Sequence, residues 1–289
     1  MRYVVAVAET GSFTRAARQC LVVQSALSHQ IARLERELGA RLFDRTSRRV
    51  RVTAAGEAFL PQARQALSFA ERAAAEVAAA AGEVRGRLTV GVIPTVAAVD
   101  LPAALRVFRG RHPHVPVRLR MASSDQLVEQ VRQGEAEIAF LGLPATARPE
   151  GVRGRELARD PLVAVLAPGH HLATRSEVGL AALAEEEFVD FSAGSPGRAQ
   201  SDRAFAAAGL HREVTFEVTT AELMAGLIRE GLGVAMLPSA YVPNLDGVVT
   251  VPVADGPERI EHVVWSAAGP TPAAAAFLDV LGVARRDAG

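Results

Sequence analysis

Two helical patterns joined by a tight turn lie near the start of the chain, and they constrain its fold more than any other feature. Ser12 is a suitable N-cap for a short helix that runs to Leu21. A second helix begins near Gln24 and stops at Gly39, a residue type that commonly ends helices. Its apolar residues recur every three or four positions and define one buried stripe: Leu27, Ile31, Leu34 and Leu38. The pattern predicts a helix-turn-helix.

The opposite face of the second helix is polar. Its first turns carry short or hydrogen-bonding side chains: Gln24, Ser25, Ser28, His29 and Arg33. A helix pair whose second member is polar on its outer face fits the major groove of DNA. We therefore expect these five side chains to face base edges and neighbouring phosphates.

Residues 41–52 follow the helix pair and are expected to form a short hairpin. They contain five arginines: Arg41, Arg45, Arg48, Arg49 and Arg51. An arginine run is often only a solvated face, but a helix pair directly upstream favours phosphate binding. The charge distribution agrees, because residues 1–87 hold 14 Arg and 8 acidic residues, whereas residues 88–289 hold 18 Arg and 24 acidic residues. A net charge of zero thus hides a basic head and an acidic body.

These segments resemble the DNA-binding signature of the bacterial LysR-type transcription regulators at nearly every position. The matching stretches are 11–17, 24–31, 34–35, 37–39, 42–45 and 53–57. The resemblance implies base contacts from the second helix and a grip on the DNA backbone from the hairpin, or wing. The implied base-contacting residues are Gln24, Ser25, Ser28 and His29, and the implied wing residues are Arg48 and Arg49.

The chain departs from the family pattern at three places. Val23 stands where a serine usually precedes the recognition helix, which removes a capping oxygen typically worth about 1 kcal/mol. His29 stands where arginine is frequent, so base or phosphate contact there is expected to depend on pH. The sequence starts at Met1, several residues later than usual, so we expect a shortened first helix.

A long helix is predicted after the wing. Thr53 caps it, and its apolar and small residues recur every three to four positions until Gly82, a span of about 45 Å. The alanine-rich stripe suits close packing against a second copy, although a monomeric spacer helix is the alternative. The resemblance implies a homodimer through this helix and assembly into a homotetramer. Gly82 and Gly86 would form the hinge to the next domain.

Strands and helices alternate from residue 87 onward. The first set comprises strands 88–93, 115–121 and 137–141 with helices 96–109 and 125–133. The second set comprises strands 162–166, 188–191, 214–218 and 234–237 with helices 197–208 and 221–230. A strand at 260–266 and a helix at 272–283 would return to the first lobe. This order predicts two α/β lobes and resembles the LysR effector domain, which is similar to periplasmic solute-binding proteins.

Four strand-to-helix junctions of the body carry hydroxyl side chains. The candidate effector-binding residues are Thr95, Ser123, Ser124, Ser192, Thr219 and Thr220. Ligands of open α/β sheets bind beyond the carboxyl ends of the strands, where helix N-termini offer free amides to an anion. Each hydroxyl could instead be a simple helix cap, but convergence of all four junctions on one cleft would make a site. We expect a small effector that carries a carboxylate.

Several classes of chemistry are not expected. A chain without lysine has no phosphate-binding Gly-Lys loop, and no dinucleotide fingerprint follows Gly91. The His170-His171 pair and the His112-x-His114 pair lack a third metal ligand nearby in the sequence. We therefore predict no cofactor, no metal and no enzymatic activity. The lone Cys20 excludes an internal disulfide, and the sequence has neither a signal peptide nor an apolar run of membrane-spanning length, so we expect a cytoplasmic protein without membrane partners.

Together these patterns predict an N-terminal all-α winged helix-turn-helix with a long linker helix and a C-terminal α/β, two-lobed, periplasmic-binding-protein-like effector domain. The expected domains are residues 1–53, 54–86 and 87–289, with lobe I at about 87–161 and 267–289 and lobe II at about 162–266. The predicted function is sequence-specific promoter binding modulated by a small molecule. The expected partners are double-stranded DNA, the effector and a second copy, with RNA polymerase as a further candidate. The alternative is a small-molecule sensor or interaction protein whose operator binding is weak or lost.

Overall fold

The computed structural model describes residues 1–45, 50–254 and 256–283. The chain divides into two compact units, and the main boundary between them lies at Gly86 and Arg87. The first unit is the head with its long helix, and the second is the body.

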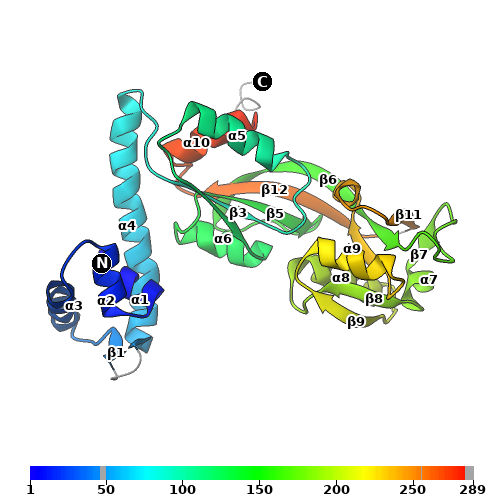
Figure 1. Cartoon of the computed structure of the whole chain (residues 1–289), viewed down its shortest axis with the longest axis horizontal. Coiled ribbons are helices and arrows are strands. Elements are labelled where there is room, and N and C mark those ends of the chain that lie inside the picture. Colours follow the sequence, from blue (N-terminus) through cyan, green and yellow to red (C-terminus); the bar gives the residue numbers. More distant parts are fainter. Residues whose placement is uncertain (46–49, 255, 284–289) are drawn as a thin grey trace. The chain divides into compact units, whose positions relative to one another are not determined.

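The head contains three helices, a hairpin and the long helix (Figure 1). The elements are α1 (Arg2–Thr10), α2 (Phe13–Gln19), α3 (Gln24–Leu38), β1 (Phe43–Arg45), β2 (Val50–Val52) and α4 (Ala54–Ala80). As predicted, Ser12 caps α2, with its hydroxyl accepting a hydrogen bond from the Arg15 amide at 3.4 Å. Gly11 and Gly39 end α1 and α3 in the left-handed conformation, with φ of 62° and 69°. The winged helix-turn-helix is confirmed.

The core of the head lies between α1, α2, α3 and the start of α4. Its buried members include Val4, Val7, Ala16, Leu27, Ile31, Leu42, Phe43 and Leu60. The predicted α3 stripe is confirmed in its first half, and Leu34 is partly buried against the same cluster. Leu38 is 47% exposed, so its assignment to the core was wrong. The physical reason is that the last turn of α3 extends past the cluster.

A close packing arrangement joins the wing to α4. The Thr53 hydroxyl donates to the Arg41 carbonyl oxygen at 2.6 Å and accepts from the Gly56 amide at 3.0 Å, which confirms it as the cap. A Cβ atom at Gly56 would lie 2.3 Å from the Leu42 carbonyl oxygen. Only glycine therefore fits there without a shift of the backbone.

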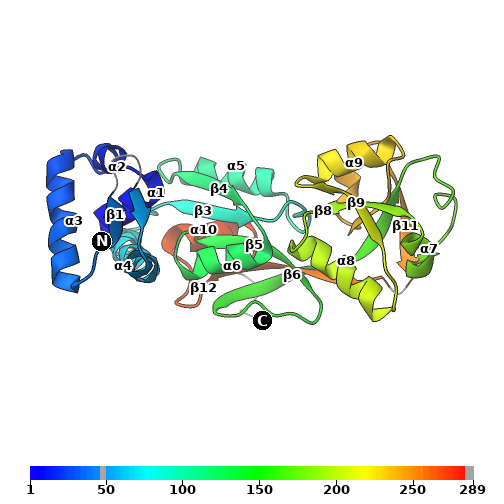
Figure 2. The same cartoon turned by 90° about the horizontal axis from the view of Figure 1, so that it is seen from below.

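The body consists of two α/β lobes joined by two long strands (Figure 2). Lobe I contains β3 (Leu88–Val92), α5 (Leu101–Arg111), β4 (Val117–Met121), α6 (Ser124–Arg132), β5 (Ile138–Pro144) and α10 (Pro272–Val280). Lobe II contains β7 (Val178–Gly179), α7 (Leu180–Ala184), β8 (Glu187–Phe191), α8 (Pro196–Ala207), β9 (Glu213–Val218), α9 (Ala221–Arg229), β10 (Ala235–Pro238), the 3-10 turn η1 (Val242–Asn244) and β11 (Val249–Ala254). The joining strands are β6 (Val152–Leu166) and β12 (Glu258–Ser266).

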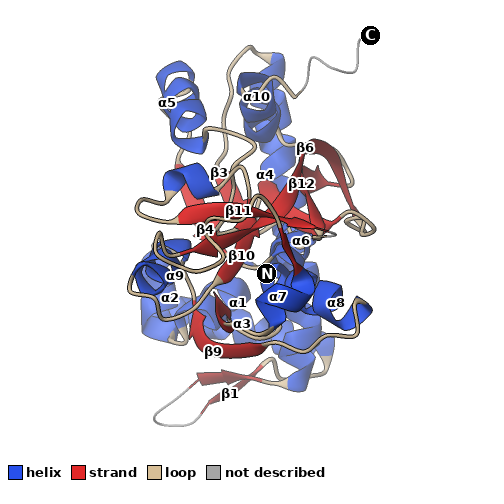
Figure 3. Ribbon diagram, turned by 90° about the vertical axis from the view of Figure 1, so that its right-hand side faces the viewer, coloured by secondary structure: helices blue, strands red, loops and turns tan. Residues whose placement is uncertain are grey.

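The main sheet runs in the order β4-β3-β5-β12-β6-β11-β7, with β10 also paired to β6. The β3 pairs with β4 and β5 are parallel, as the alternation of strands and helices predicted. Helices α5 and α10 lie on the same side of this sheet (Figure 3), where Phe108 and Phe277 pack edge to face with ring centroids 5.5 Å apart. In lobe II, β8 and β9 form a separate parallel pair.

Some parts of the body differ from the sequence prediction. Helix α5 begins at Leu101 rather than residue 96, because the Ala97 and Ala98 amides donate to the Glu261 carboxylate instead of entering a helix. The sequence prediction missed the first half of β6, because many of its residues are charged and no apolar run marks it as a strand. By contrast, strand β12 pairs with β5 from Arg259 to Trp265, in agreement with the predicted return of strand 260–266 to the first lobe.

Candidate nucleic-acid interface and ligand cavity

The outer face of α3 presents the predicted base-contacting residues. Gln24, Ser25 and His29 are exposed, and Ser28 is half-buried beside them. Arg33 is also accessible, but its guanidinium contacts the Glu37 carboxylate one turn later at 2.9 Å. An exposed pair of this kind contributes well under 1 kcal/mol, so a phosphate can displace it.

The predicted wing residues are only partly described. Arg45 lies in β1, opposite Val50 of β2. Arg48 and Arg49 lie outside the described residues. Glu35 connects the recognition helix to the wing, because its carboxylate accepts from the Leu42 amide at 2.8 Å and the Phe43 amide at 3.3 Å. The wing is therefore positioned by the same helix that carries the polar face.

The turn between α2 and α3 has two unusual residues. Val23 precedes α3 and provides no side-chain cap, as its chemistry predicted. Leu21 adopts a left-handed conformation with φ of 56° and is 92% exposed. This conformation usually costs an L-residue about 1–2 kcal/mol. No sequence signal marks this strain, because the position carries leucine rather than glycine.

A cavity of about 390 Å³ lies in the body, and all six predicted effector residues line it. Thr95 follows β3, Ser123 and Ser124 stand at the start of α6, Ser192 follows β8, and Thr219 and Thr220 precede α9. Apolar side chains complete the wall: Ile93, Met121, Phe191 and Val218. The four strand-to-helix junctions thus converge on one cavity.

The six hydroxyl side chains differ in their hydrogen bonds. Ser123 and Thr220 accept from the Gln126 and Leu223 amides at 3.4 and 3.3 Å, so they act as helix caps. Ser124 is buried and exchanges hydrogen bonds with the Gly142 backbone. The exposed hydroxyls of Ser192 and Thr219 have no hydrogen-bond partner among the described residues. These two remain available to a ligand.

A buried charged cluster underlies the cavity at the joining strands. The Arg259 guanidinium donates to the Thr95 hydroxyl at 2.6 Å and to its carbonyl oxygen at 3.1 Å. It also contacts Glu261, and it lies 3.7 Å from Asp160. All three charged side chains are at most 4% exposed. Thr95 is therefore engaged by Arg259, and the amides after it are engaged by Glu261.

Each carboxylate of this cluster is anchored in a different lobe. Glu261 accepts from the Ala97 and Ala98 amides of lobe I, each at 3.0 Å. Asp160 accepts from the Ser239 hydroxyl at 2.6 Å and the Ala240 amide at 3.1 Å, both in lobe II. Burial raises the pKa of Glu261 and lowers the pKa of Arg259. The cluster links the positions of the two lobes.

Among the unpredicted residues that line the cavity, two have polar side chains that bond across the body. Arg259 belongs to no local motif, and Gln200 of α8 is a buried amide that donates to the Gly142 carbonyl oxygen of β5 at 3.5 Å. Both side chains form hydrogen bonds to residues that are distant in the sequence. The only local signal was a polar residue in an otherwise apolar strand or helix face.

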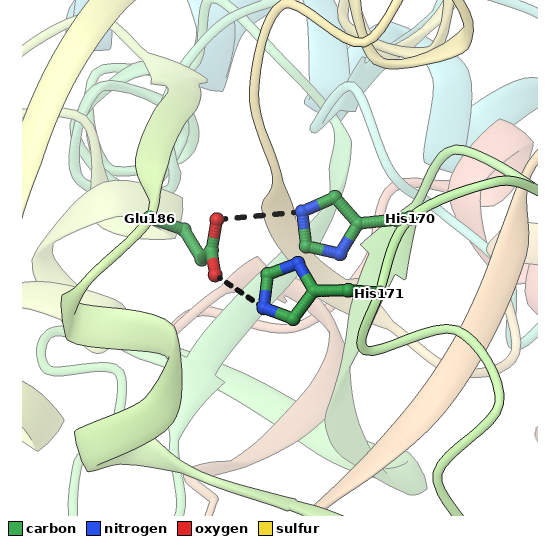
Figure 4. Close-up of side chains that lie close together, drawn as sticks. All are labelled: His170, His171 and Glu186. Atoms are coloured by element: carbon green, nitrogen blue, oxygen red, sulfur yellow. Dashed lines mark ion pairs between the residues drawn. The ribbon is translucent and has the colours of Figure 1, made fainter.

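A third potential metal ligand lies beside the histidine pair at 170 and 171. The carboxylate of Glu186 contacts both rings (Figure 4). The sequence prediction considered only neighbouring residues and therefore missed this carboxylate. Across the described residues, no helix is both long and apolar enough to cross a membrane.

Comparisons with known proteins agree with both units. Residues 1–57 match the family "Bacterial regulatory helix-turn-helix protein, lysR family", and residues 81–284 match the "LysR substrate binding domain". The uncharacterized HTH-type transcriptional regulator YnfL of Escherichia coli K12 is 35% identical over 265 residues, which cover 88% of this chain and 86% of YnfL. The DNA-binding transcriptional dual regulator OxyR of the same organism is 33% identical over 275 residues, which cover 93% of this chain and 89% of OxyR.

A solved structure shows the same fold along the whole chain. Full-length CbnR in complex with its target DNA has a TM-score of 0.66 at 26% identity, and the match covers 99% of this chain and 98% of CbnR. The family matches of the head and of the body, and the relatives that match over most of their length, therefore agree on one family. The chain belongs to the LysR family of DNA-binding transcription regulators.

Proposed function

We propose that this regulator binds a small effector in the body cavity and that the bound effector changes how the paired heads engage DNA. The observation that carries the proposal is the convergence of four strand-to-helix junctions on one cavity of about 390 Å³, a volume within the usual range for small-molecule sites. The joining strands carry residues that are hydrogen-bonded to both lobes. A ligand that changes the position of one lobe relative to the other would therefore also shift the joining strands.

The chemistry of the cavity favours a carboxylate on a small, partly apolar body. Ser123 and Thr220 each satisfy one amide of the first turns of α6 and α9. Other first-turn amides lack partners within a helix and can bind an anion. The junction at Thr95 contributes differently, because its amides already bind Glu261. The carboxylate would therefore bind near α6 and α9, with Ser192 and Thr219 as hydroxyl partners.

The proposed signal is not a thiol reaction within the body. Several relatives are named hydrogen peroxide-inducible genes activators. In this chain the single cysteine is Cys20 of the head, and residues 87–289 contain none. We propose reversible binding of the effector without its chemical conversion, so the protein is a regulator and not an enzyme.

The proposed DNA-contacting residues are Gln24, Ser25, Ser28, His29, Arg33, Arg45, Arg48 and Arg49. The first five lie on α3, and Arg45 lies in the wing, and these positions support the assignment. Since such a regulator acts on promoter DNA, we place it in the cytoplasm. Contacts to bases would give specificity, whereas wing arginines would add affinity that is independent of sequence.

Self-association through α4 is also proposed. This helix spans 27 residues, or about 40 Å. Phe69 and Val77 are 58% and 74% exposed on it, amid alanines that allow close approach. A dimer would cover these apolar side chains, and a tetramer would need further contacts. Light scattering would test this, and a monomer at micromolar concentration would contradict it.

The effector proposal is tested by a thermal-shift screen of small organic acids and amino acids. A ligand at 100 times its dissociation constant should stabilise the protein by about 2.7 kcal/mol. Thr219→Val should weaken binding of a hit about tenfold without lowering stability, since its hydroxyl has no protein partner among the described residues. The matched control is Thr215→Val, an exposed residue of β9 outside the cavity. Equal affinities in both variants would contradict the proposed site.

A further inference from the structure

His170, His171 and Glu186 form a compact group in lobe II, away from the residues that line the cavity. Nε2 of His170 lies 3.4 Å from one Glu186 carboxylate oxygen, and Nε2 of His171 lies 3.1 Å from the other. Figure 4 shows both rings directed at the carboxylate from the same side. The ring centroids are 4.5 Å apart with a tilt of 31°. Adjacent residues of an extended chain point to opposite sides, so this arrangement requires the turn in which both histidines lie.

The backbone holds the three side chains in place. The turn with His170 is closed by hydrogen bonds from the His170 amide to the Ala167 carbonyl oxygen and from the Ala173 amide to the His170 carbonyl oxygen, at 3.0 and 2.9 Å. Leu172 follows directly and is buried in the lobe II core. On the other side, Glu186 stands between Leu183 and Phe188, which belong to the same core. The ligand atoms thus project from two fixed segments.

The donor set suits a borderline transition metal. Zinc binds imidazole nitrogen and carboxylate oxygen at about 2.0–2.2 Å, which places tetrahedral ligand atoms roughly 3.3 Å apart. In this structure the two nitrogens lie 3.4 and 3.1 Å from the two different oxygens of the Glu186 carboxylate, and one ligand atom from each of the three residues lies within 4.8 Å of the others. Magnesium and calcium prefer all-oxygen sites. The single carboxylate would partly neutralise a divalent charge.

One contact competes with metal binding. The Leu172 amide donates to Nδ1 of His170 at 3.3 Å, which places the proton of the neutral ring on Nε2, facing Glu186. A metal ion must displace that proton, and Nδ1–H must then turn away from the Leu172 amide. His171 is 65% exposed and has no such constraint. Metal binding at His170 would therefore compete with the hydrogen bond from the Leu172 amide.

We propose that His170, His171 and Glu186 bind a divalent transition-metal ion of the zinc type. The proposal is independent of the proposed function, because no cavity residue takes part.

The test is isothermal titration of the metal-free full chain with zinc chloride at pH 7.5, with magnesium chloride as a second titrant. We expect about one zinc ion per chain, no magnesium binding, and visible absorption bands when cobalt replaces zinc. Glu186→Gln and His171→Ala should each weaken zinc binding at least about tenfold. Glu185→Gln is the matched control, because it removes the same charge from the neighbouring residue. His114→Ala controls for binding at the other histidine pair.

The outcomes distinguish this site from metal binding elsewhere on the chain. Unchanged zinc affinity in both Glu186→Gln and His171→Ala would overturn the proposal, as would absence of zinc binding. A loss confined to His114→Ala would place the metal elsewhere and would also overturn it. Equal losses of zinc affinity in Glu185→Gln and Glu186→Gln would indicate an effect of general surface charge instead of coordination. That result would also overturn the proposal. If one variant is unfolded by circular dichroism, the other still decides the result.

Discussion

Replacing Arg259 with methionine should destabilise the body by about 3 kcal/mol at neutral pH. The variant leaves Asp160 and Glu261 buried without the cation that they share. Breaking a buried ion pair by removing one partner typically costs about 3–5 kcal/mol. The lower end applies here, because Asp160 keeps its contacts to lobe II and Glu261 keeps the Ala97 and Ala98 amides. Methionine fills most of the volume of the arginine side chain, so a residual cavity adds little to the loss of stability.

Urea unfolding followed by the fluorescence of Trp265 measures this loss. Trp265 is the single tryptophan of the chain and lies in β12, the strand that also carries Arg259. The control is Arg159→Met, since Arg159 forms surface pairs with Glu156 and Glu258 and is 51% exposed. That variant should lose less than about 1 kcal/mol. Equal losses for Arg259→Met and Arg159→Met would show that the buried ion pairs of Arg259 contribute no more than surface pairs.

The loss at Arg259 should also depend on pH. Burial raises the pKa of Glu261, whereas Arg259 lowers it, so the variant should raise this pKa further. A carboxyl whose pKa is raised by folding favours the folded state below its unfolded pKa, and this contribution is lost as pH rises through the folded pKa. The deficit of the variant should therefore shrink as pH falls toward about 4, by at most about 1.4 kcal/mol per pH unit. Adding Glu261→Gln should recover part of the loss at neutral pH.

Three further predictions concern the backbone of the head, helix α5 as a control, and the Thr220 cap of α9. Leu21→Gly should raise the stability of the head by about 0.5–1 kcal/mol, because glycine removes strain at φ of 56°, and a lower calorimetric melting temperature would contradict this. Gly56→Ala should destabilise the head by about 2 kcal/mol and weaken DNA binding, since its Cβ would lie 2.3 Å from the Leu42 carbonyl oxygen, whereas Gly110→Ala, with open space around it, should be neutral or stabilising. Thr220→Val should cost about 1 kcal/mol through loss of the α9 cap, and an unchanged urea midpoint would rule out that role.

The head could be predicted from its sequence because its determinants are local. The Ser12 and Thr53 caps, the glycine at position 39 and the apolar spacing in α3 lie within a few residues of the structures they specify. The error at Leu38 arose because periodicity identifies a face but does not reveal where the partner elements end. The convergence of the hydroxyl residues followed from the general placement of ligands at strand ends.

The charged cluster and the histidine group could not be predicted in this way. Arg259 contacts Thr95 across 164 residues, and no local pattern marks that pairing. Glu186 reaches the histidine pair through a separate turn beside the same core. The start of α5 was misplaced for the same reason, because Glu261 binds the amides that would otherwise have begun the helix. Long-range polar contacts therefore account for most of what local patterns left undetermined.

Fluorescence anisotropy tests whether the polar face of α3 reads DNA sequence, as we propose. The titration compares a duplex from the region upstream of its own gene with a shuffled duplex at 150 mM salt. We predict at least about a thousandfold tighter binding to the upstream duplex. Gln24→Ala should reduce that ratio about tenfold or more while leaving the shuffled duplex unaffected, and Arg48→Ala should weaken both. Equal affinity of the unmodified protein for both duplexes, or an equal loss on both in Gln24→Ala, would contradict the account.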